Sequence, residues 1–297
     1  MAGRLADLTV PVGACDSHVH ILGPSDRFPY WPGRTYTPPD ASPGELKALH
    51  ARLRISAAVL VQPSVYGTDN SRLVAGLQEV GGRCRGVAVI DADVADSELA
   101  ALAVAGVRGA RLNLATFSPG SRDDAATAAR IRAIAGRVAG HGWHAQLYAR
   151  PLEILAHAEL LASLPTPVVL DHFGCLRAEC GPDSPVGRRL LELVRSAGMY
   201  VKLSAPYRIS ADAADPRIGE LIQAFAEAAP DGILWASDWP HTGPADGRPG
   251  GHAVSSFIDV DDAAALARFL CWLPADHLRV AALVTNPGRL YGFDYGP

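Results

Sequence analysis

The feature that most constrains the fold of this chain is a regular alternation of short apolar runs with helix-forming segments. Eight runs rich in aliphatic and β-branched residues lie at 12–18, 55–62, 86–91, 107–113, 143–148, 167–172, 199–204 and 233–238. They are continuous instead of alternating with polar residues, which is typical of strands buried on both faces. We therefore expect a parallel sheet that other elements cover on both sides.

Segments rich in Ala, Leu and Arg separate these runs. We expect helices at 42–53, 70–80, 96–105, 123–139, 152–163, 185–197, 216–228, 261–271 and 276–283. Eight strands alternating with helices predict an α/β fold of the (β/α)8 TIM-barrel type. The alternative is a doubly wound open sheet, which we disfavour because no Gly-x-Gly-x-x-Gly pattern opens a helix.

The domain organisation follows from composition and from the absence of a linker. Hydrophobic residues make up 48% of the chain and charged residues 20%, which is enough for a large core. No low-complexity stretch divides the sequence, so we expect one domain over residues 1–297. Two inserts, near 23–41 and 243–257, follow the first and eighth runs, and we expect them to lie over the barrel mouth like a lid.

Several classes of partner are disfavoured. The net charge is −4 and no run of Lys or Arg occurs, which argues against nucleic acid. No membrane-length apolar stretch or secretory segment is visible. The five cysteines are scattered without Cys-x-x-Cys spacing, so neither a disulfide framework nor a structural zinc site is expected. We expect a cytoplasmic protein that acts on a small molecule, with a homo-oligomer left open.

Polar side chains stand where the predicted strands end. The first run ends in His18-Val19-His20, and residues two apart on a strand point to the same face. This pair alone would suit either a metal site or two ordinary polar side chains. Later runs end in Ser64, Asp91, Arg111, Tyr148, Asp171 and His172, Lys202 and Ser204, and Asp238 with His241. Because barrel active sites form at these strand ends, the pattern predicts a catalytic mouth.

These strand ends also carry a resemblance to a known family. The matching segments are Cys-Asp-Ser-His-Val-His at 15–20, Val-Gln-Pro-Ser at 61–64, Gly-Ala-Arg-Leu-Asn at 109–113, Leu-Asp-His-Phe-Gly at 170–174, Trp-Ala-Ser-Asp-Trp-Pro-His at 235–241 and Thr-Asn-Pro-Gly-Arg-Leu-Tyr at 285–291. The chain resembles the amidohydrolase superfamily, and within it the branch of pyrone-dicarboxylate lactonases and related sugar lactonases. The matches span nearly the whole chain.

The resemblance implies a function and a set of site residues. The function is hydrolysis of a carboxylic ester in a lactone, with a small acidic or sugar-derived substrate. Asp238 would be the general base that activates water, and histidines would polarise the carbonyl. The catalytic set would be His18, His20, His172 and Asp238, and the substrate contacts would be Tyr36, Ser64, Arg111, Tyr148 and Arg208, to which we add His241. Arg111 and Arg208 would anchor a carboxylate.

The chain also departs from the family pattern. Phe117 stands about where a further arginine of the pyrone-dicarboxylate lactonase would fall, and Cys175 replaces the arginine of a His-x-Gly-Arg pattern. Fewer guanidinium groups imply weaker recognition of a second carboxylate. We therefore hypothesise a less charged lactone than the pyrone dicarboxylate, either sugar-derived or a monocarboxylated aromatic breakdown product.

Metal dependence is a separate question. The fourth run has no lysine to bridge two metals, and Tyr148 stands where a histidine ligand is often found, so no binuclear centre is expected. The lactonase that the chain resembles works without metal, and lactones are activated esters. We therefore expect no required cofactor, while a single divalent ion such as zinc on His18, His20, His172 and Asp238 stays chemically open.

Other activities are also compatible with these residues. A metal-dependent decarboxylase of an aromatic or unsaturated acid, a lactone isomerase and a non-catalytic binding barrel are the alternatives. We expect Asp16 to orient a histidine and Lys202 to pair with Asp171 or Asp91 inside the barrel. His50 and His144 are interpreted as helix, loop or surface residues.

Overall fold

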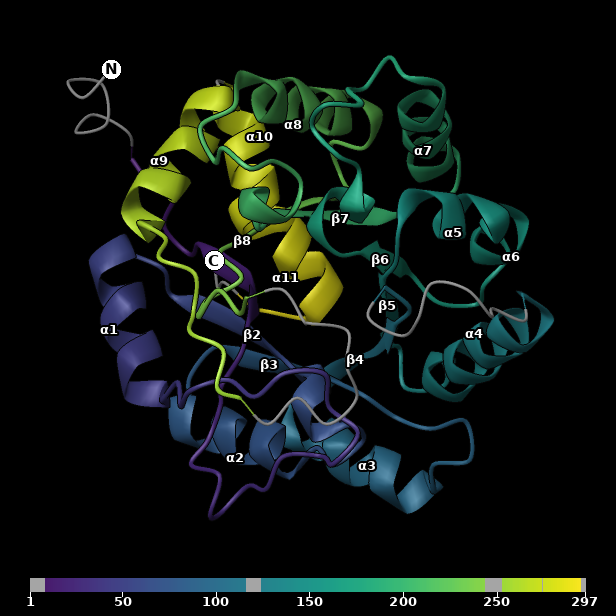
Figure 1. The fold of residues 1–297 in the computed structure, drawn as a ribbon. Helices are drawn as coiled ribbons and strands as arrows, with labels where there is room; N and C mark the ends of the chain where they lie inside the picture. Colours follow the sequence, from purple (N-terminus) through teal and green to yellow (C-terminus); the bar gives the residue numbers. More distant parts are fainter. Residues whose placement is uncertain (1–8, 116–123, 244–252, 274, 295–297) are drawn as a thin grey trace.

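The computed structural model describes residues 9–115, 124–243, 253–273 and 275–294, and it contains one eight-stranded parallel sheet in the order β1 to β8 (Figure 1). The strands are β1 (Cys15–Val19), β2 (Ala57–Val61), β3 (Cys84–Ala88), β4 (Val107–Asn113), β5 (His144–Tyr148), β6 (Val168–Leu170), β7 (Tyr200–Ser204) and β8 (Ile233–Ala236). Each strand pairs with the next one in sequence. This order confirms the predicted (β/α)8 TIM barrel.

The first and last strands are joined just beyond their ends. The backbone N–H of Asp238 donates to the carbonyl oxygen of His18 at 3.0 Å, and the N–H of His20 donates to that of Trp239 at 2.9 Å. The backbone bonds that bring β1 and β8 together therefore involve His18, His20 and Asp238 themselves. The predicted histidine pair and the predicted base are fixed to each other by the main chain.

Helices surround the sheet as the alternation predicts. They are α1 (Pro43–Leu53), α2 (Ser71–Val80), α3 (Asp96–Ala105), α4 (Asp124–Ala139), α5 (Pro151–Ala156), α6 (Ala158–Ala162), α7 (Pro185–Ser196), α8 (Pro216–Ala228), α9 (Asp262–Trp272), α10 (Asp276–Val280) and α11 (Asn286–Tyr291). Ser42 begins α1 with a capping box, since its hydroxyl accepts from the N–H of Glu45 and the Glu45 carboxylate accepts from the N–H of Ser42.

Two helix predictions need correction. The segment at 152–163 is two short helices, because His157 leaves the helical conformation between α5 and α6. The last predicted helix does not stop at residue 283. It passes through a π-helical turn, Ala281–Thr285, into α11, so a Pro at the second position of α11 does not end it.

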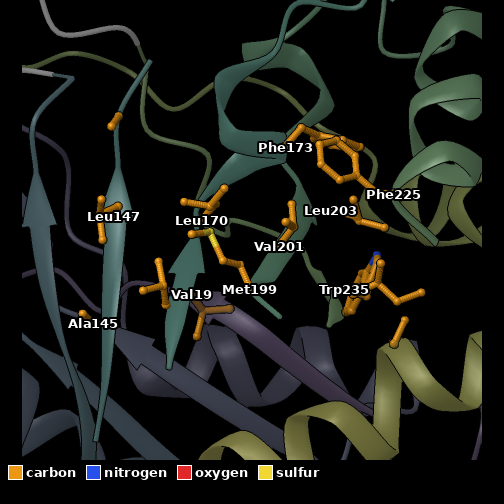
Figure 2. Packing of buried hydrophobic residues seen from close by; sticks show 14 of the residues in the cluster. Val19, Ala145, Leu147, Leu170, Phe173, Met199, Val201, Leu203, Phe225 and Trp235 are labelled. Atoms are coloured by element: carbon orange, nitrogen blue, oxygen red, sulfur yellow. The ribbon is translucent and has the colours of Figure 1, made fainter. Parts of the chain in front are cut away.

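Two apolar layers hold the barrel together. Figure 2 shows the outer one, where Phe173 lies against Phe225 of α8, and Leu203 and Trp235 belong to the same cluster. The inner layer includes Val59, Val87, Val169, Leu234 and Tyr291. Burial of such side chains is the main favourable term in folding.

His144 corrects one interpretation of the sequence. It lies on β5 with an exposed fraction of 1%, and it faces Gly109 of the neighbouring strand β4. A Cβ at Gly109 would lie 2.2 Å from Cε1 of this imidazole, so only glycine leaves room for the ring. His144 is therefore an interior barrel residue and not a surface residue.

The insert at 23–41 packs on the barrel mouth. Phe28 and Tyr36 from the insert share an apolar cluster with Val65 and Tyr66, which follow β2. Gly23 N–H donates to the Tyr66 hydroxyl at 2.8 Å. Of the second predicted insert, residues 244–252 lie outside the described residues, and Phe257 bridges back to Thr242.

Within the described ranges, the helices are too short or too polar for any of them to cross a lipid bilayer.

Candidate active site

Three imidazoles and one carboxylate converge at the C-terminal ends of β1, β6 and β8. The Nε2 atoms of His18, His20 and His172 lie 3.6, 3.5 and 3.8 Å from Oδ1 of Asp238. All four side chains are at least 94% buried. The structure thus brings together the four residues that the sequence suggested as a catalytic set.

The backbone at this point is unusual. His172 has φ of 51° and Asp238 has φ of 65°, both in the left-handed region that non-glycine residues seldom occupy. Both residues stand just beyond the last residue of their strands. Such conformations cost roughly 1–3 kcal/mol each and cluster at functional sites, where the surrounding structure holds them in place.

The hydrogen bonds on the far side of each ring define what faces the centre. Nδ1 of His20 donates to the carbonyl oxygen of Val61 at 2.7 Å, so in the tautomer with one ring proton Nε2 carries the lone pair. Nδ1 of His172 lies 2.8 Å from the Ser204 hydroxyl oxygen. Burial lowers the pKa of His172 to about 4 and lowers that of His18 well below its ordinary value, so both rings are neutral at pH 7.

Asp238 is held as an anion from its other side. Its Oδ2 accepts from the hydroxyl of Tyr207 at 2.7 Å and from Nε of Arg208 at 2.9 Å. Burial alone would raise the pKa of Asp238, but the charge of Arg208 outweighs it and holds this pKa well below the ordinary value. Oδ1, in contrast, has no hydrogen-bond partner among the described side chains.

Lone pairs and an anion that face one another require a cation between them. A proton on one imidazole would meet this need, and so would a metal ion. The separations of 3.5 to 3.8 Å are longer than hydrogen bonds. They are close to the roughly 3.3–3.6 Å expected between ligand atoms around a tetrahedral ion with bonds of about 2.0–2.2 Å. His18, His20 and Asp238 could therefore hold a divalent ion.

A cavity of about 490 Å³ lies against the site on the side of β2, β3 and β4. Ser64 and Arg111 line it, together with Asp91 and Arg130. The Cζ atom of Arg111 lies 5.2 Å from the centre of the Tyr148 ring, whose centre is 5.4 Å from that of His172. Tyr148 does not line the cavity, but its ring lies between Arg111 of the cavity wall and His172 of the site.

Tyr36 reaches the same region from the insert. Burial raises the pKa of its hydroxyl, and hydrogen bonds with the hydroxyls of Thr242 and Ser64 oppose that rise. Of the predicted substrate contacts, Ser64 and Arg111 thus line the cavity, whereas Tyr36 contacts Ser64 and Tyr148 contacts Arg111. Their contact with substrate stays a prediction.

Two other predicted contacts have protein partners. Arg208 donates to Asp238 and, through a terminal nitrogen, to Thr242 at 3.2 Å, so its guanidinium is engaged with the predicted base. His241 turns towards α9, because its Nε2 lies 3.0 Å from Oδ1 of Asp262. Phe117, the residue in place of a family arginine, lies outside the described residues.

The roles expected of three further residues can be compared with the structure. Asp16 accepts from the N–H of Ser237 at 2.9 Å and lies 3.3 Å from Nε2 of His50. It therefore ties β1 to β8 and α1, and the histidine side chain that it contacts is His50, outside the catalytic set. His50 belongs to a helix, as predicted, but it is buried and not a surface residue. Lys202 lies 3.7 Å from Asp171, in line with the predicted ion pair.

Tyr207 is the residue that sequence reasoning missed. Its hydroxyl contacts the candidate base directly, and it lies in the short turn after β7 (Pro206–Arg208). The signal that could have found it is its position beside Arg208 at a strand end. A tyrosine in a loop does not show its orientation in the sequence, however.

The chain matches proteins of known activity along most of its length. The family model described as amidohydrolase matches residues 15–293. A 2-pyrone-4,6-dicarboxylate hydrolase of Comamonas testosteroni is 34% identical over 95% of this chain and 91% of that protein. A 4-sulfomuconolactone hydrolase of Hydrogenophaga intermedia is 32% identical over 95% of this chain and 90% of that protein.

More distant relatives and solved structures agree on the fold. A D-galactarolactone isomerase of Agrobacterium fabrum is 27% identical over 98% of this chain and 95% of that protein. The structure of a protein described as a 2-pyrone-4,6-dicarboxylic acid hydrolase from Pseudomonas putida superposes with a TM-score of 0.77 at 30% identity, covering 96% of this chain and 100% of that one. A zinc-bound amidohydrolase from Burkholderia multivorans, with a TM-score of 0.67, 19% identity and coverage of 95% and 99%, shares the fold. The family match, which spans both candidate histidine segments and Asp238, shows that this chain belongs to the amidohydrolase family.

Proposed function

We propose that this protein is a hydrolase that opens a lactone, with Asp238 as the general base. The observation that carries the proposal is the buried carboxylate of Asp238, whose pKa is held low while Oδ1 faces three imidazoles beside a cavity. Relatives named as lactone hydrolases support it, because they match along 95% of this chain.

Each of these groups has a role in one step of ester hydrolysis. The lactone carbonyl oxygen lies toward the imidazoles, and Oδ1 of Asp238 accepts a proton from water as the water oxygen attacks the carbonyl carbon. An N–H group or a metal ion among the imidazoles stabilises the oxyanion of the tetrahedral intermediate. Collapse of the intermediate breaks the ring C–O bond, and the proton on Asp238 passes to the leaving alkoxide. The product is the open hydroxy acid, and Asp238 is an anion again.

The positive charge at the centre comes from a proton or from a metal ion. Without metal, the donor to the carbonyl oxygen is Nε2 of His172, which carries the proton when Nδ1 accepts from the Ser204 hydroxyl. With metal, His18, His20 and Asp238 would hold the ion, which would supply Lewis-acid polarisation of the carbonyl. The expectation that no metal is required stays a prediction. Metal analysis of protein purified without added zinc, with lactonase rates before and after chelation, decides it.

The charges around the cavity favour a substrate with one acidic group. Arg208 is engaged with Asp238, and Nε of Arg111 donates to Asp171 at 3.0 Å. Asp91, which also lines the cavity, has no ion-pair partner among the residues described. A second substrate carboxylate would meet Asp91 as well as Arg130, so the cavity wall offers it little net attraction. We therefore expect a higher kcat/KM for a lactone with one carboxylate than for the pyrone dicarboxylate, and the reverse order would overturn this substrate assignment.

Lactone isomerisation is the second candidate, because attack by a substrate hydroxyl needs the same carbonyl activation and one relative is a D-galactarolactone isomerase. Reaction in water enriched in oxygen-18 separates the two. Hydrolysis places one heavy oxygen in the product carboxylate, whereas isomerisation places none. The metal-dependent decarboxylase stays a third alternative, and release of carbon dioxide would identify it.

A further inference from the structure

A second carboxylate lies behind the catalytic imidazoles, and the proposed mechanism does not use it. Asp171 follows β6 and is fully buried. Its Oδ1 lies 3.2 Å from Nδ1 of His18, and its Oδ2 accepts from Nε of Arg111 at 3.0 Å. Asp171 is therefore in contact with one imidazole of the site and with the arginine that lines the cavity.

Nδ1 of His18 has two neighbours, one of which requires a proton on this nitrogen and the other a lone pair. Asp171 Oδ1 can only accept a hydrogen bond, so it requires a proton on Nδ1. Nζ of Lys202 lies 3.3 Å from the same nitrogen, and an ammonium group can only donate, so it requires a lone pair there. The two partners therefore select different tautomers of His18.

Asp171 has the greater need for this nitrogen as a partner, because its buried Oδ1 has no hydrogen-bond donor among the described side chains unless Nδ1 of His18 carries the proton. Lys202 already donates to Oε1 of Gln146 at 2.7 Å, so its ammonium keeps a good partner if it yields Nδ1. Oδ1 of Asp171 has no other close donor, since Lys202 is 3.7 Å away. Leaving a buried carboxylate oxygen without a donor costs more than leaving one ammonium hydrogen weakly bonded.

We propose that Asp171 is a positioning residue that places the proton of His18 on Nδ1, so that Nε2 faces Asp238 as a lone pair. Arg111 contributes by fixing the carboxylate, because it binds Oδ2 and leaves Oδ1 for the imidazole. This arrangement gives His18 the same polarity as His20, whose Nδ1 donates to Val61. His18 and His20 then both direct an Nε2 lone pair towards Asp238, where a proton or a metal ion can bind.

The variant Asp171→Asn tests this directly. Arg111 can only donate, so it would hold the amide oxygen and turn the NH₂ group to His18. The NH₂ group would then donate to Nδ1, which must carry a lone pair, and the ring proton would move to Nε2. Nitrogen-15 NMR of chelated, metal-free protein labelled in histidine reports the tautomer, with the His18 signal identified by its loss in His18→Gln. We expect a protonated Nδ1 in the wild type and a protonated Nε2 in Asp171→Asn.

Two further variants separate this role from simple structural damage. Lys202→Met removes the competing ammonium and leaves Asp171, so the wild-type tautomer of His18 should persist. This variant tests whether Lys202 sets the tautomer even if Asp171→Asn does not fold. Asp215→Asn removes another buried carboxylate with an arginine partner, at the start of α8 and away from the site. It should leave the His18 signal unchanged.

Kinetics add a second readout, which rests on the proposed lactonase function. Asp171→Asn should lower kcat by roughly 10- to 100-fold, as the loss of groups that orient active-site histidines does, with a smaller change in KM. Because Asp171 acts through His18, adding Asp171→Asn to His18→Gln should lower kcat no further. Additive losses, a wild-type Nε2–H tautomer, or a tautomer that changes in Lys202→Met and not in Asp171→Asn would overturn the proposal. Absence of any lactonase activity would reject the proposed function alone, since the tautomer is read without substrate.

Discussion

The hydroxyl of Tyr207 donates a hydrogen bond of 2.7 Å to Oδ2 of Asp238, the same oxygen that Arg208 contacts at 2.9 Å. Both donors come from the turn after β7, whereas the carboxylate comes from the end of β8. Two donors on one oxygen leave the other oxygen to face the imidazoles. The turn after β7 therefore sets the direction in which the candidate base acts.

Tyr207→Phe should lower kcat about 10-fold with little change in KM. The variant removes one hydrogen bond to a charged group, which contributes roughly 1.5–3 kcal/mol, and solvent that enters can replace part of it. Steady-state rates on the best lactone measure this. Tyr30→Phe is the matched control, because its hydroxyl bonds to Pro38 within the insert and not to the site. Equal losses in both variants would contradict a specific role for Tyr207.

Arg208→Gln should make activity more sensitive to acid. Burial raises the pKa of Asp238, and Arg208 is the leading opposing charge, so its loss raises that pKa towards and above its ordinary value. A base works only as an anion, so the acidic limb of the kcat profile should move to higher pH. A profile from pH 4 to 9 for wild type and variant tests the shift. An acidic limb at the same pH in both proteins would remove Arg208 from this role.

Stability should fall as the solution is acidified from pH 7 towards pH 4. Burial lowers the pKa of His144 to about 3, whereas in the unfolded chain it stays near 6.5. Between these values the unfolded chain binds a proton that the folded protein excludes, so the free energy of unfolding decreases with falling pH. Urea unfolding at pH 7 and pH 5 measures this. His144→Leu should show a smaller decrease than wild type, and an equal decrease would show that His144 does not contribute.

Gly109→Ala should destabilise the barrel. The added Cβ would lie 2.2 to 2.7 Å from atoms of the buried His144 ring, and the ring has no exposed end that could swing away. Overpacking of this kind costs roughly 1–3 kcal/mol. Thermal unfolding gives the value, and Gly136→Ala is the control, since nothing lies within 4 Å of a Cβ there. The double variant Gly109→Ala, His144→Ala should recover part of the loss.

The barrel and its mouth were predictable because strands buried on both faces appear in the sequence as continuous apolar runs. Continuous apolar runs gave the strands, and polar residues that end them, such as His18 and Asp238, had to meet at one edge of a parallel barrel. The sequence did not reveal that His144 is interior, because a histidine at the start of a strand looks the same whether Gly109 opens space for it or not. Its placement depends on a neighbour 35 positions away in the chain.

The orientation of side chains could not be predicted from the sequence. Arg208 was predicted at the site, but a guanidinium in a loop can turn to substrate or to Asp238, and only the three-dimensional arrangement shows the latter. Asp16 was expected to orient a histidine, but which one could not be predicted, because its partners Ser237 and His50 come from distant segments. Hydrogen-bond partners far apart in sequence leave no local pattern to read.

The central claim is that Asp238 activates water to open a lactone. The most direct test compares wild type with Asp238→Asn on a panel of mono- and dicarboxylated lactones in water enriched in oxygen-18. We predict that the wild type forms hydroxy acids carrying one heavy oxygen, and that Asp238→Asn, folded with an unchanged circular dichroism spectrum, loses at least about 100-fold in kcat, as expected when a general base is removed. A folded Asp238→Asn variant that retains the wild-type rate, or a wild-type product without heavy oxygen, would contradict the account.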